Sequence, residues 1–171
     1  MPVPAYMTIE GDRQGSITTG AGNGDSIGGK SREGHEDEIM VQGYEHQIIQ
    51  PTDVQSGAPT GKRMHKEVRI LKQFDGSSPL LLNALTTGEQ LKGTIKWFRI
   101  SPQGEEQHYY TVELEGAVCT SIEPHMANCL DEANRFQEHM EWVSFRYRKI
   151  HWRHDVMGKE GEDDWKAAGG K

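Results

Sequence analysis

Apolar residues recur at every second position along several segments of the chain, which is the spacing of half-buried β-strands. The longest such segment runs from Tyr110 to Ile122, where most even-numbered positions are apolar and Glu113 and Glu115 alternate with them. Two further strands are predicted, with apolar faces formed by Met64, Val68, Ile70 and Phe74 in one and by Leu91, Ile95 and Trp97 in the other. The pattern therefore predicts a mainly β protein.

Two other segments change their apolar face partway along. Between residues 141 and 153 the apolar positions move from Phe145 and Tyr147 to Ile150 and Trp152, which predicts a bulge near residues 148–149. Residues 38–49 change face in the same way around Gly43, where a glycine tolerates the kink. Long strands that change face without stopping are typical of bent sandwiches and small barrels. The predicted fold is all-β, a two-sheet β-barrel-like sandwich with one short α-helix.

The single helix is expected at residues 78–88. Ser78 can cap it, Pro79 fits its first turn, and Gly88 stands where a left-handed C-terminal residue is favoured. A length of 171 residues suits one domain, so we expect a single unit over 1–171. Within it we predict a mobile Gly-rich loop over 11–34, turn-rich loops over 51–61 and 123–137, and a flexible polar tail over 155–171.

Composition and charge narrow the class of protein. The chain has 19 Lys and Arg against 26 Asp and Glu, a net charge of -7, which disfavours general binding to nucleic acid or to anionic membranes. No run approaches the ~20 apolar residues of a membrane span. The first basic residue is Arg13, and we expect no signal peptide. Cys119 and Cys129 are too few for a disulfide framework and are expected to be reduced thiols.

One motif suggests nucleotide chemistry. Residues 24–31 read GDSIGGKS and satisfy the phosphate-loop pattern, in which Lys30 would reach a phosphate. That motif requires a buried strand before it and a helix after it, and the local pattern supports neither. An enzyme using this loop is therefore a minor alternative, and unchanged nucleotide affinity in Lys30→Ala would remove it.

Other chemistry finds little support. On a strand His151 and His154 would point to opposite faces, and the eight histidines form no known metal motif. No serine lies in a nucleophile elbow, and Cys119 is expected on the polar face of its strand. We therefore predict no catalytic residue, no metal and no cofactor. A second alternative is a monomeric β-sandwich that binds a ligand through exposed aromatic residues such as Tyr109 or Trp142.

Charged residues occur in blocks of one sign. The basic blocks are Lys62, Arg63, Lys66, Arg69 and Lys72, and Arg146, Arg148, Lys149 and Arg153; acidic residues cluster at 33–38 and 160–164. They can be solvated faces with local ion pairs. They can also be complementary flanks through which copies associate head to tail. Sequence leaves both interpretations open.

Three blocks of sequence together resemble one family. They are residues 74–89 (FDGSSPLLLNALTTGE), residues 109–118 (YYTVELEGAV) and residues 141–152 (EWVSFRYRKIHW), followed by Asp163, Asp164 and Trp165. These blocks are similar to the haemolysin-coregulated proteins, the tube subunits of bacterial type VI secretion, and the similarity spans residues 5–165. The Gly-rich segment 12–34 departs from the family pattern.

The resemblance implies a β-barrel-like subunit without catalytic activity that forms a hexameric ring. Rings would stack into the inner tube of a contractile injection machine and could hold effector proteins in their lumen. The implied partners are further copies of the chain, a tube-tip spike protein, the contractile sheath and effectors, with no nucleic acid or membrane. The implied location is the bacterial cytoplasm, followed by secretion through the type VI machine without a signal peptide.

The resemblance also suggests where contacts between copies lie. The loop over 50–62 would project and help rings to stack, with Thr52, Asp53, Val54 and Gln55 as candidates. The strand residues that match the family's lumen-facing wall are Glu45 and Gln47, and alternation places both opposite the apolar face of their strand. The charge blocks, and not the resemblance, give the candidates for the interface between subunits, which are the basic residues Lys62, Arg63, Lys66, Arg69, Arg146 and Arg148.

Overall fold

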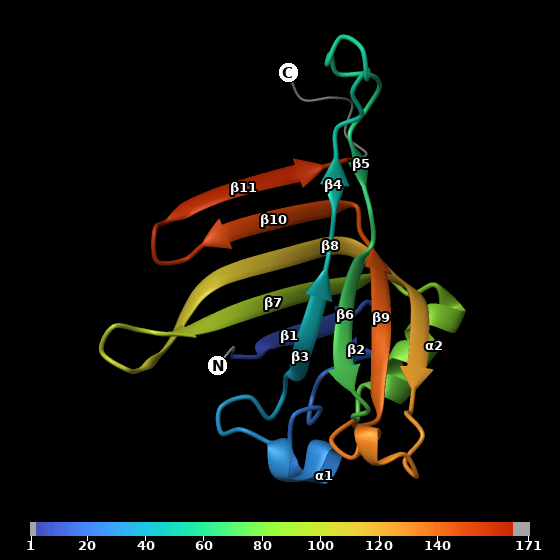
Figure 1. The fold of residues 1–171 in the computed structure, drawn as a ribbon, viewed down its shortest axis with the longest axis vertical. Coiled ribbons are helices and arrows are strands. Elements are labelled where there is room, and N and C mark those ends of the chain that lie inside the picture. The colour runs from blue at the N-terminus through green and yellow to red at the C-terminus, as the bar shows by residue number, and fades with distance from the viewer. Residues whose placement is uncertain (1–2, 166–171) are drawn as a thin grey trace.

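A computed structural model describes residues 3–165 (Figure 1). Its elements are β1 (Ala5–Gly11), β2 (Gly15–Ser16), α1 (Gly24–Ile27), β3 (Ile39–Glu45), β4 (Ile48–Ile49), β5 (Met64–His65), β6 (Val68–Gln73), α2 (Ser78–Thr87), β7 (Leu91–Ile100), β8 (Glu106–His125), β9 (Met140–Arg146), β10 (Lys149–His154) and β11 (Lys159–Asp164), with 3-10 turns at Gly28–Lys30 and Glu132–Asn134. The predicted all-β class with a short helix is confirmed.

The strands close into a barrel because β8 pairs on both of its halves. The sheet order is β11-β10-β8-β7-β1-β3-β6-β9. The last strand, β9, also pairs with β8, and this pairing closes the strands from β8 to β9 into a barrel. The first half of β8 lies between β7 and β10, and its second half pairs with β9. The β10–β11 and β7–β8 hairpins extend beyond the barrel (Figure 1).

A bulge in β8 corrects the predicted alternation. Leu91 pairs with Ala117 but Gly93 pairs with Leu114, so β8 carries an extra residue there, and Gly116 adopts a positive φ of 59°. Val112 and Leu114 are buried before the bulge, whereas Ala117 and Cys119 are buried after it. Cys119 therefore lies in the core and not on the polar face that simple alternation predicts. Both cysteines are free thiols, as expected.

The two predicted changes of face have different structures. In β3 the register shifts between Val41 and Gly43, which confirms a bulge at the glycine. Near Arg148 the strand does not bulge but stops: β9 ends at Arg146, and β10 begins at Lys149 against a different part of β8. One expected strand is thus two strands around a corner, and buried Tyr147 lies in that corner.

The Gly-rich segment is packed and not a mobile loop. Ile17, Thr18 and Ala21 are buried in it, and its middle forms α1. A side chain at Gly22 would lie 2.2 Å from the backbone oxygen of His35, so glycine is needed there for close packing. Gly22, one of the glycines that suggested mobility in the sequence, therefore permits close backbone contact.

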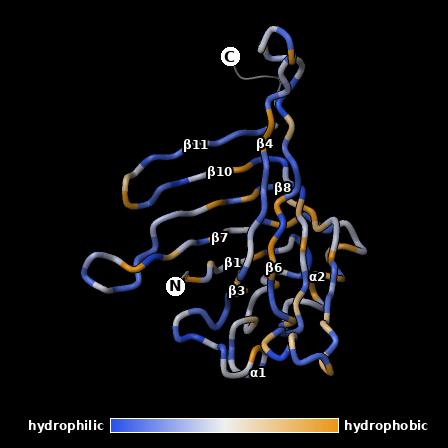
Figure 2. The backbone as a smooth tube through the Cα atoms, viewed as in Figure 1, coloured by the Kyte–Doolittle hydropathy of each residue, from blue (hydrophilic) through white to orange (hydrophobic). Residues whose placement is uncertain are grey.

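Two other boundaries differ from prediction. Lys159–Asp164 is not a flexible tail but strand β11, paired along its length with β10, and residues 166–171 lie outside the described part. Figure 2 shows β11 as hydrophilic, so it has no apolar alternation to reveal it.

The start of α2 also differs from prediction. Ser77, not Ser78, is the N-cap of α2, while Gly88 ends that helix in the left-handed conformation as predicted. Leu81 and Ala84 anchor α2 in the core.

Candidate assembly surfaces

An arm made of residues 46–66 projects from the barrel at the top of Figure 1. Ile48 and Ile49 pair with His65 and Met64, and a bridge joins Thr52 to Pro59 near the tip. The tip turn is held by Asp53, whose carboxylate accepts hydrogen bonds from the Gln55 and Ser56 backbone N–H groups and from the Ser56 hydroxyl. These bonds, led by those from Ser56, lower the pKa of Asp53.

The four predicted stacking residues lie at this tip. Thr52, Asp53, Val54 and Gln55 are all exposed, and the Val54 side chain is 99% accessible. The geometry makes these residues available to another molecule.

A chain of hydrogen bonds fastens the base of the arm to the barrel corner and to β11. The Tyr147 hydroxyl lies 2.8 Å from His46 Nε2 and 2.6 Å from His65 Nδ1, and His65 Nε2 lies 2.7 Å from Asp163 Oδ2. We name this chain, with Arg63, the arm-base network. Because a hydroxyl has one proton, Tyr147 donates to one histidine and accepts from the other. Arg63 Nη2 donates to Asp163 Oδ1 over 2.7 Å at the exposed end.

The ionisable groups of the arm-base network are shifted by their surroundings. Burial, helped by nearby His65, lowers the pKa of His46 to about 4, so His46 is neutral at neutral pH. The hydrogen bond from Arg63 lowers the pKa of Asp163. Burial raises the pKa of Tyr147. The network therefore has a neutral His46 at its buried end and an ion pair between Arg63 and Asp163 at its exposed end.

The predicted lumen residues both point into solvent. Glu45 ends β3 and pairs with Arg69 over 3.1 Å, whereas the exposed Gln47 lies in the connection to β4. Their neighbours Tyr44 and His46 are partly buried, as the alternation predicts.

The predicted basic interface residues fall into two kinds. The four arginines have acidic partners within the chain: Arg63 with Asp163, Arg69 with Glu45 and Glu123, Arg146 with Glu67, and Arg148 with Asp164. Lys62 and Lys66 are exposed and make no ion pair with the described residues. Trp142 lies under the Arg69 guanidinium, whose carbon is 4.8 Å from the ring centroid. Local ion pairing, the first of the two interpretations, is thus present.

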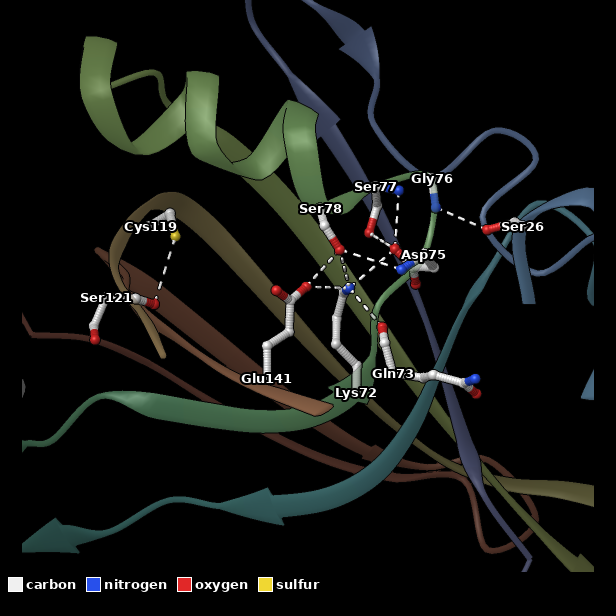
Figure 3. Close-up of polar contacts among 10 residues, drawn as sticks. All are labelled: Ser26, Lys72, Gln73, Asp75, Gly76, Ser77, Ser78, Cys119, Ser121 and Glu141. Atoms are coloured by element: carbon white, nitrogen blue, oxygen red, sulfur yellow. Dashed lines mark hydrogen bonds and ion pairs between the residues drawn. The ribbon is translucent and has the colours of Figure 1, made fainter. Parts of the chain in front are cut away.

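Lys72 is not part of this basic surface. Its side chain is 0% exposed, and its Nζ lies 2.9 Å from Asp75 Oδ1, 2.5 Å from Glu141 Oε1 and 3.0 Å from Ser78 Oγ (Figure 3). We name these four residues the Lys72 cluster; it joins β6, β9 and the start of α2. The sequence held one signal of this burial, because Lys72 shares the parity of Val68 and Ile70, which are buried on β6.

Sequence reasoning missed an aromatic cleft between the arm base and the hairpin strands. The cleft has a volume of about 450 Å³ and is lined by six ring side chains and two aliphatic ones: Tyr44, His46, Trp97, Tyr109, Tyr110 and Trp152, with Ile48 and Val112. Trp97 stands edge-on to Tyr44, with centroids 5.0 Å apart. The lining comes from β3, β4, β7, β8 and β10, so no local run of sequence reveals it. Tyr109, suggested as a ligand contact, does lie here, but Trp142 does not.

The phosphate-loop look-alike has a different geometry. Residues 24–27 form a four-residue helix and 28–30 a 3-10 turn, and Lys30 pairs with Glu138. No strand leads into it among the described residues, so the geometry of a nucleotide loop is absent. Within residues 3–165 no His, Cys, Asp and Glu side chains are grouped to hold a metal ion, and no helix is long and apolar enough to cross a membrane.

Comparison with known proteins agrees over nearly the whole chain. The family model described as "Type VI secretion system effector, Hcp" matches residues 6–154. A protein named "Major exported protein" from Pseudomonas aeruginosa PAO1 is 53% identical over 168 residues, covering 98% of each chain. A crystal structure of an Hcp protein matches with a TM-score of 0.92 at 42% identity, covering 96% of this chain and 99% of its own. The secreted protein Hcp3 from Pseudomonas aeruginosa matches with a TM-score of 0.82 at 47% identity, with the same coverage.

Proposed function

Because this chain belongs to the Hcp family of type VI secretion proteins, we propose that it closes into a hexameric ring and that its rings stack to form the inner tube of the secretion machine. It is a type VI secretion tube subunit. The observation that carries the proposal is the 53% identity over 98% of the chain, joined to a closed barrel with a projecting arm. The alternative of a monomeric ligand-binding sandwich is not favoured.

Stacking is assigned to the arm tip. Thr52, Asp53, Val54 and Gln55 contact the adjoining ring, because the self-capped turn holds Val54 outward without help from the barrel. Glu45 and Gln47 face the lumen, where effector proteins are carried. Lys62, Arg63, Lys66, Arg69, Arg146 and Arg148 contribute to contacts between copies of the chain.

The other partners follow from the place of a tube in such a machine. We infer contacts with a tube-tip spike protein at one end and with a contractile sheath around the tube. The relative named "Major exported protein" supports export of this chain too, which we place through the type VI machine from the bacterial cytoplasm and without a signal peptide. We assign the chain no catalytic activity and no cofactor, since its task is assembly.

Negative-stain electron microscopy and analytical ultracentrifugation test the ring. We expect annular particles with a central hole and a mass of six copies of the 19.2 kDa chain. A monomer at every concentration, with no annular particles, would contradict the proposal.

A variant of the arm tip tests stacking separately. Val54→Asp places a charge on a side chain that touches nothing in its own chain, so we expect intact rings that no longer form tubes. The matched control is Gln103→Asp, in the exposed turn of the β7–β8 hairpin, which should leave tubes unchanged. Tubes of normal length from Val54→Asp would remove the arm tip from the contact.

A further inference from the structure

The arm is attached to the rest of the chain through very few polar groups. Its strands β4 and β5 pair with each other and with no strand of the barrel. Within residues 3–165, every hydrogen bond between the arm and the rest of the chain comes from one of three arm side chains, those of His46, Arg63 and His65. They bond to Tyr147 at the barrel corner and to β11, which passes the arm base in Figure 1. The arm-base network is therefore the polar attachment of the arm.

The bonding groups fix which nitrogen atoms of the network carry protons. Arg63 lowers the pKa of Asp163, so that carboxylate is ionised and can only accept, and His65 Nε2 beside it carries a proton. A neutral His65 then has a lone pair on Nδ1, which accepts the proton of the Tyr147 hydroxyl over 2.6 Å. The oxygen of that hydroxyl accepts in turn from His46 Nε2 over 2.8 Å. All the bonds thus point in one direction, from His46 toward Asp163.

The network has room for one extra proton. If that proton goes to His65, its Nδ1 becomes a donor to the Tyr147 oxygen and the hydroxyl proton turns to His46 Nε2, so every bond is kept with its direction reversed. The charge on His65 is compensated, because its Nε2 lies 2.7 Å from Asp163 Oδ2. If the proton goes to His46 alone, Nε2 of that ring remains a donor and the original direction is kept. One extra proton therefore leaves the arm attached.

A second extra proton breaks the network. With both histidines doubly protonated, His46 and His65 each direct an N–H group at the same Tyr147 oxygen. The hydroxyl proton then has no acceptor among these groups, and two positive rings lie on either side of the tyrosine, where they repel each other. Burial and nearby His65 already oppose this state, since together they lower the pKa of His46 to about 4.

Charged groups around the two histidines offer little further compensation. The hollow beside His46 is lined by Glu45, Lys66, Glu67 and Arg69, and the hollow beside His65 by Arg63, Lys66, Glu67 and Arg146. Glu45 pairs with Arg69 and Glu67 with Arg146, so neither carboxylate is free. On its other side His46 meets the aromatic cleft, where the titratable groups are the phenols of Tyr44, Tyr109 and Tyr110. Among the described residues Asp163 is the one carboxylate bonded to either histidine, and it compensates a single charge.

We propose that the arm-base network is an acid-operated latch: the arm stays attached while the two histidines share at most one extra proton, and it is released when both carry one. The inference rests on the proposed stacking of rings through the arm tip. A released arm no longer presents its tip in a fixed direction, so stacked rings separate in acid. Because His46 has a pKa of about 4 in the closed latch and 6.5 when free, acid can favour the open latch by at most about 300-fold.

Tube length measured against pH by negative-stain electron microscopy tests the latch. We expect long tubes at about pH 7.5 and mainly separate rings at about pH 4.5, with tubes forming again on return to neutral solution. His46→Gln and His65→Gln each remove one of the two protonation sites while leaving an amide that can bond to Tyr147, so tubes of both variants should persist in acid. His125→Gln, at an exposed position at the end of β8, is the matched control and should lose its tubes as the unmodified chain does.

A dye on the arm reports the latch without requiring tubes. Ala58→Cys, at an exposed position of the arm, is labelled with a maleimide fluorophore in a Cys129→Ser background, where the remaining Cys119 is buried. The fluorescence anisotropy of this dye should fall in acid, because a released arm rotates faster, and it should stay constant in His46→Gln. The same dye on Gln103→Cys, in the exposed turn of the β7–β8 hairpin, controls for effects of acid on the dye and on the whole protein.

The outcomes separate the latch from stacking. Tubes of the unmodified chain that persist in acid would overturn the latch and leave stacking standing, and so would tubes of His46→Gln and His65→Gln that are lost at the same pH as those of the unmodified chain. If neither variant forms tubes in neutral solution, an arm dye that loosens in acid equally with and without His46 would overturn the latch. A chain that forms no tubes at any pH, while its arm still loosens in acid, would overturn stacking and keep the latch.

Discussion

The Lys72 cluster and the arm-base network both join three parts of the chain, yet they use opposite chemistry. The Lys72 cluster places a full positive charge against two carboxylates whose side chains are 3% exposed. The arm-base network passes through a tyrosine and two histidines, and its one carboxylate is 33% exposed and paired with Arg63. The charged groups of the Lys72 cluster are therefore buried, whereas the ion pair of the arm-base network lies at the surface.

This difference predicts that the stability of the two sites depends on different things: on the presence of every member at the Lys72 cluster, and on pH at the arm-base network. A buried ion cluster tolerates no loss of a member, because the charges that remain are left without water or partner. The arm-base network contains His46, whose protonation is opposed by burial, so its stability responds to pH. The barrel is thus fastened rigidly beside α2, while the arm is fastened in a pH-dependent way.

The largest effect is expected from Lys72→Met. The change leaves Asp75 and Glu141 facing each other in the core, and we expect a loss of about 3–5 kcal/mol in the free energy of unfolding. Urea unfolding at fixed protein concentration measures it. Lys92→Met, on an exposed position of β7, is the matched control and should change stability by less than about 0.5 kcal/mol. Equal midpoints for the two variants would mean that the cluster is not a structural anchor.

The second largest effect is expected in the pH dependence of the free energy of unfolding, through His46 at the arm base. His46 has a pKa of about 4 in the folded chain and an ordinary value of 6.5, so between these values the unfolded chain binds more protons. Stability should therefore fall as pH drops from 6.5 to 4, by about 2 kcal/mol after allowance for partial exposure. His46→Gln should flatten this part of the curve, whereas His125→Gln, exposed at the end of β8, should not. An unchanged slope in His46→Gln would contradict the assignment.

A smaller loss is expected from Tyr147→Phe. Without the hydroxyl, nitrogen atoms of His46 and His65 lose a partner that lies within 2.8 Å, which should cost about 1–2 kcal/mol. Chemical denaturation measures the loss, and limited proteolysis of the arm should become faster. Tyr109→Phe, on the rim of the cleft, serves as control and should leave both measurements unchanged.

The smallest effect is expected from Arg146→Ala. Its ion pair with Glu67 is largely exposed, so the folded monomer should lose at most about 0.5 kcal/mol. The same variant should weaken the ring more than the monomer if Arg146 serves as an interface residue. Sedimentation measures the stability of the ring, and urea unfolding of the same preparation measures that of the monomer. Equal small changes in both would mean that Arg146 is an ordinary solvated surface residue and not an interface residue.

Much of this architecture was predictable where one face of a strand is buried. Alternation found the cores of β6, β7 and β8, and Gly43 marked the bulge of β3. Alternation could not find β11, whose residues are polar on both faces and which is held by backbone pairing with β10. It also misplaced Cys119, because the bulge at Gly116 reverses the faces of β8.

The candidate surfaces were predictable only where a local segment carries them. The loop at Thr52 to Gln55 is continuous in sequence, and its projection follows from turn residues and family resemblance. The aromatic cleft draws on five strands, and the arm-base network joins residues about 100 positions apart, such as His65 and Asp163. Such assemblies depend on how the strands are arranged in space, which short-range patterns do not encode.

The twenty residues of β8 belong both to the closed barrel and to the β7–β8 hairpin that extends beyond it. A pull applied to the hairpins is thus transmitted along one covalent backbone into the barrel and does not depend on a hinge between two bodies. Its hydrogen bonds to β7, β9 and β10 run across the strand, so an axial force loads many of them in shear at once instead of peeling them one by one. In this tube subunit, mechanical continuity between the hairpins and the barrel is therefore supplied by a single long strand.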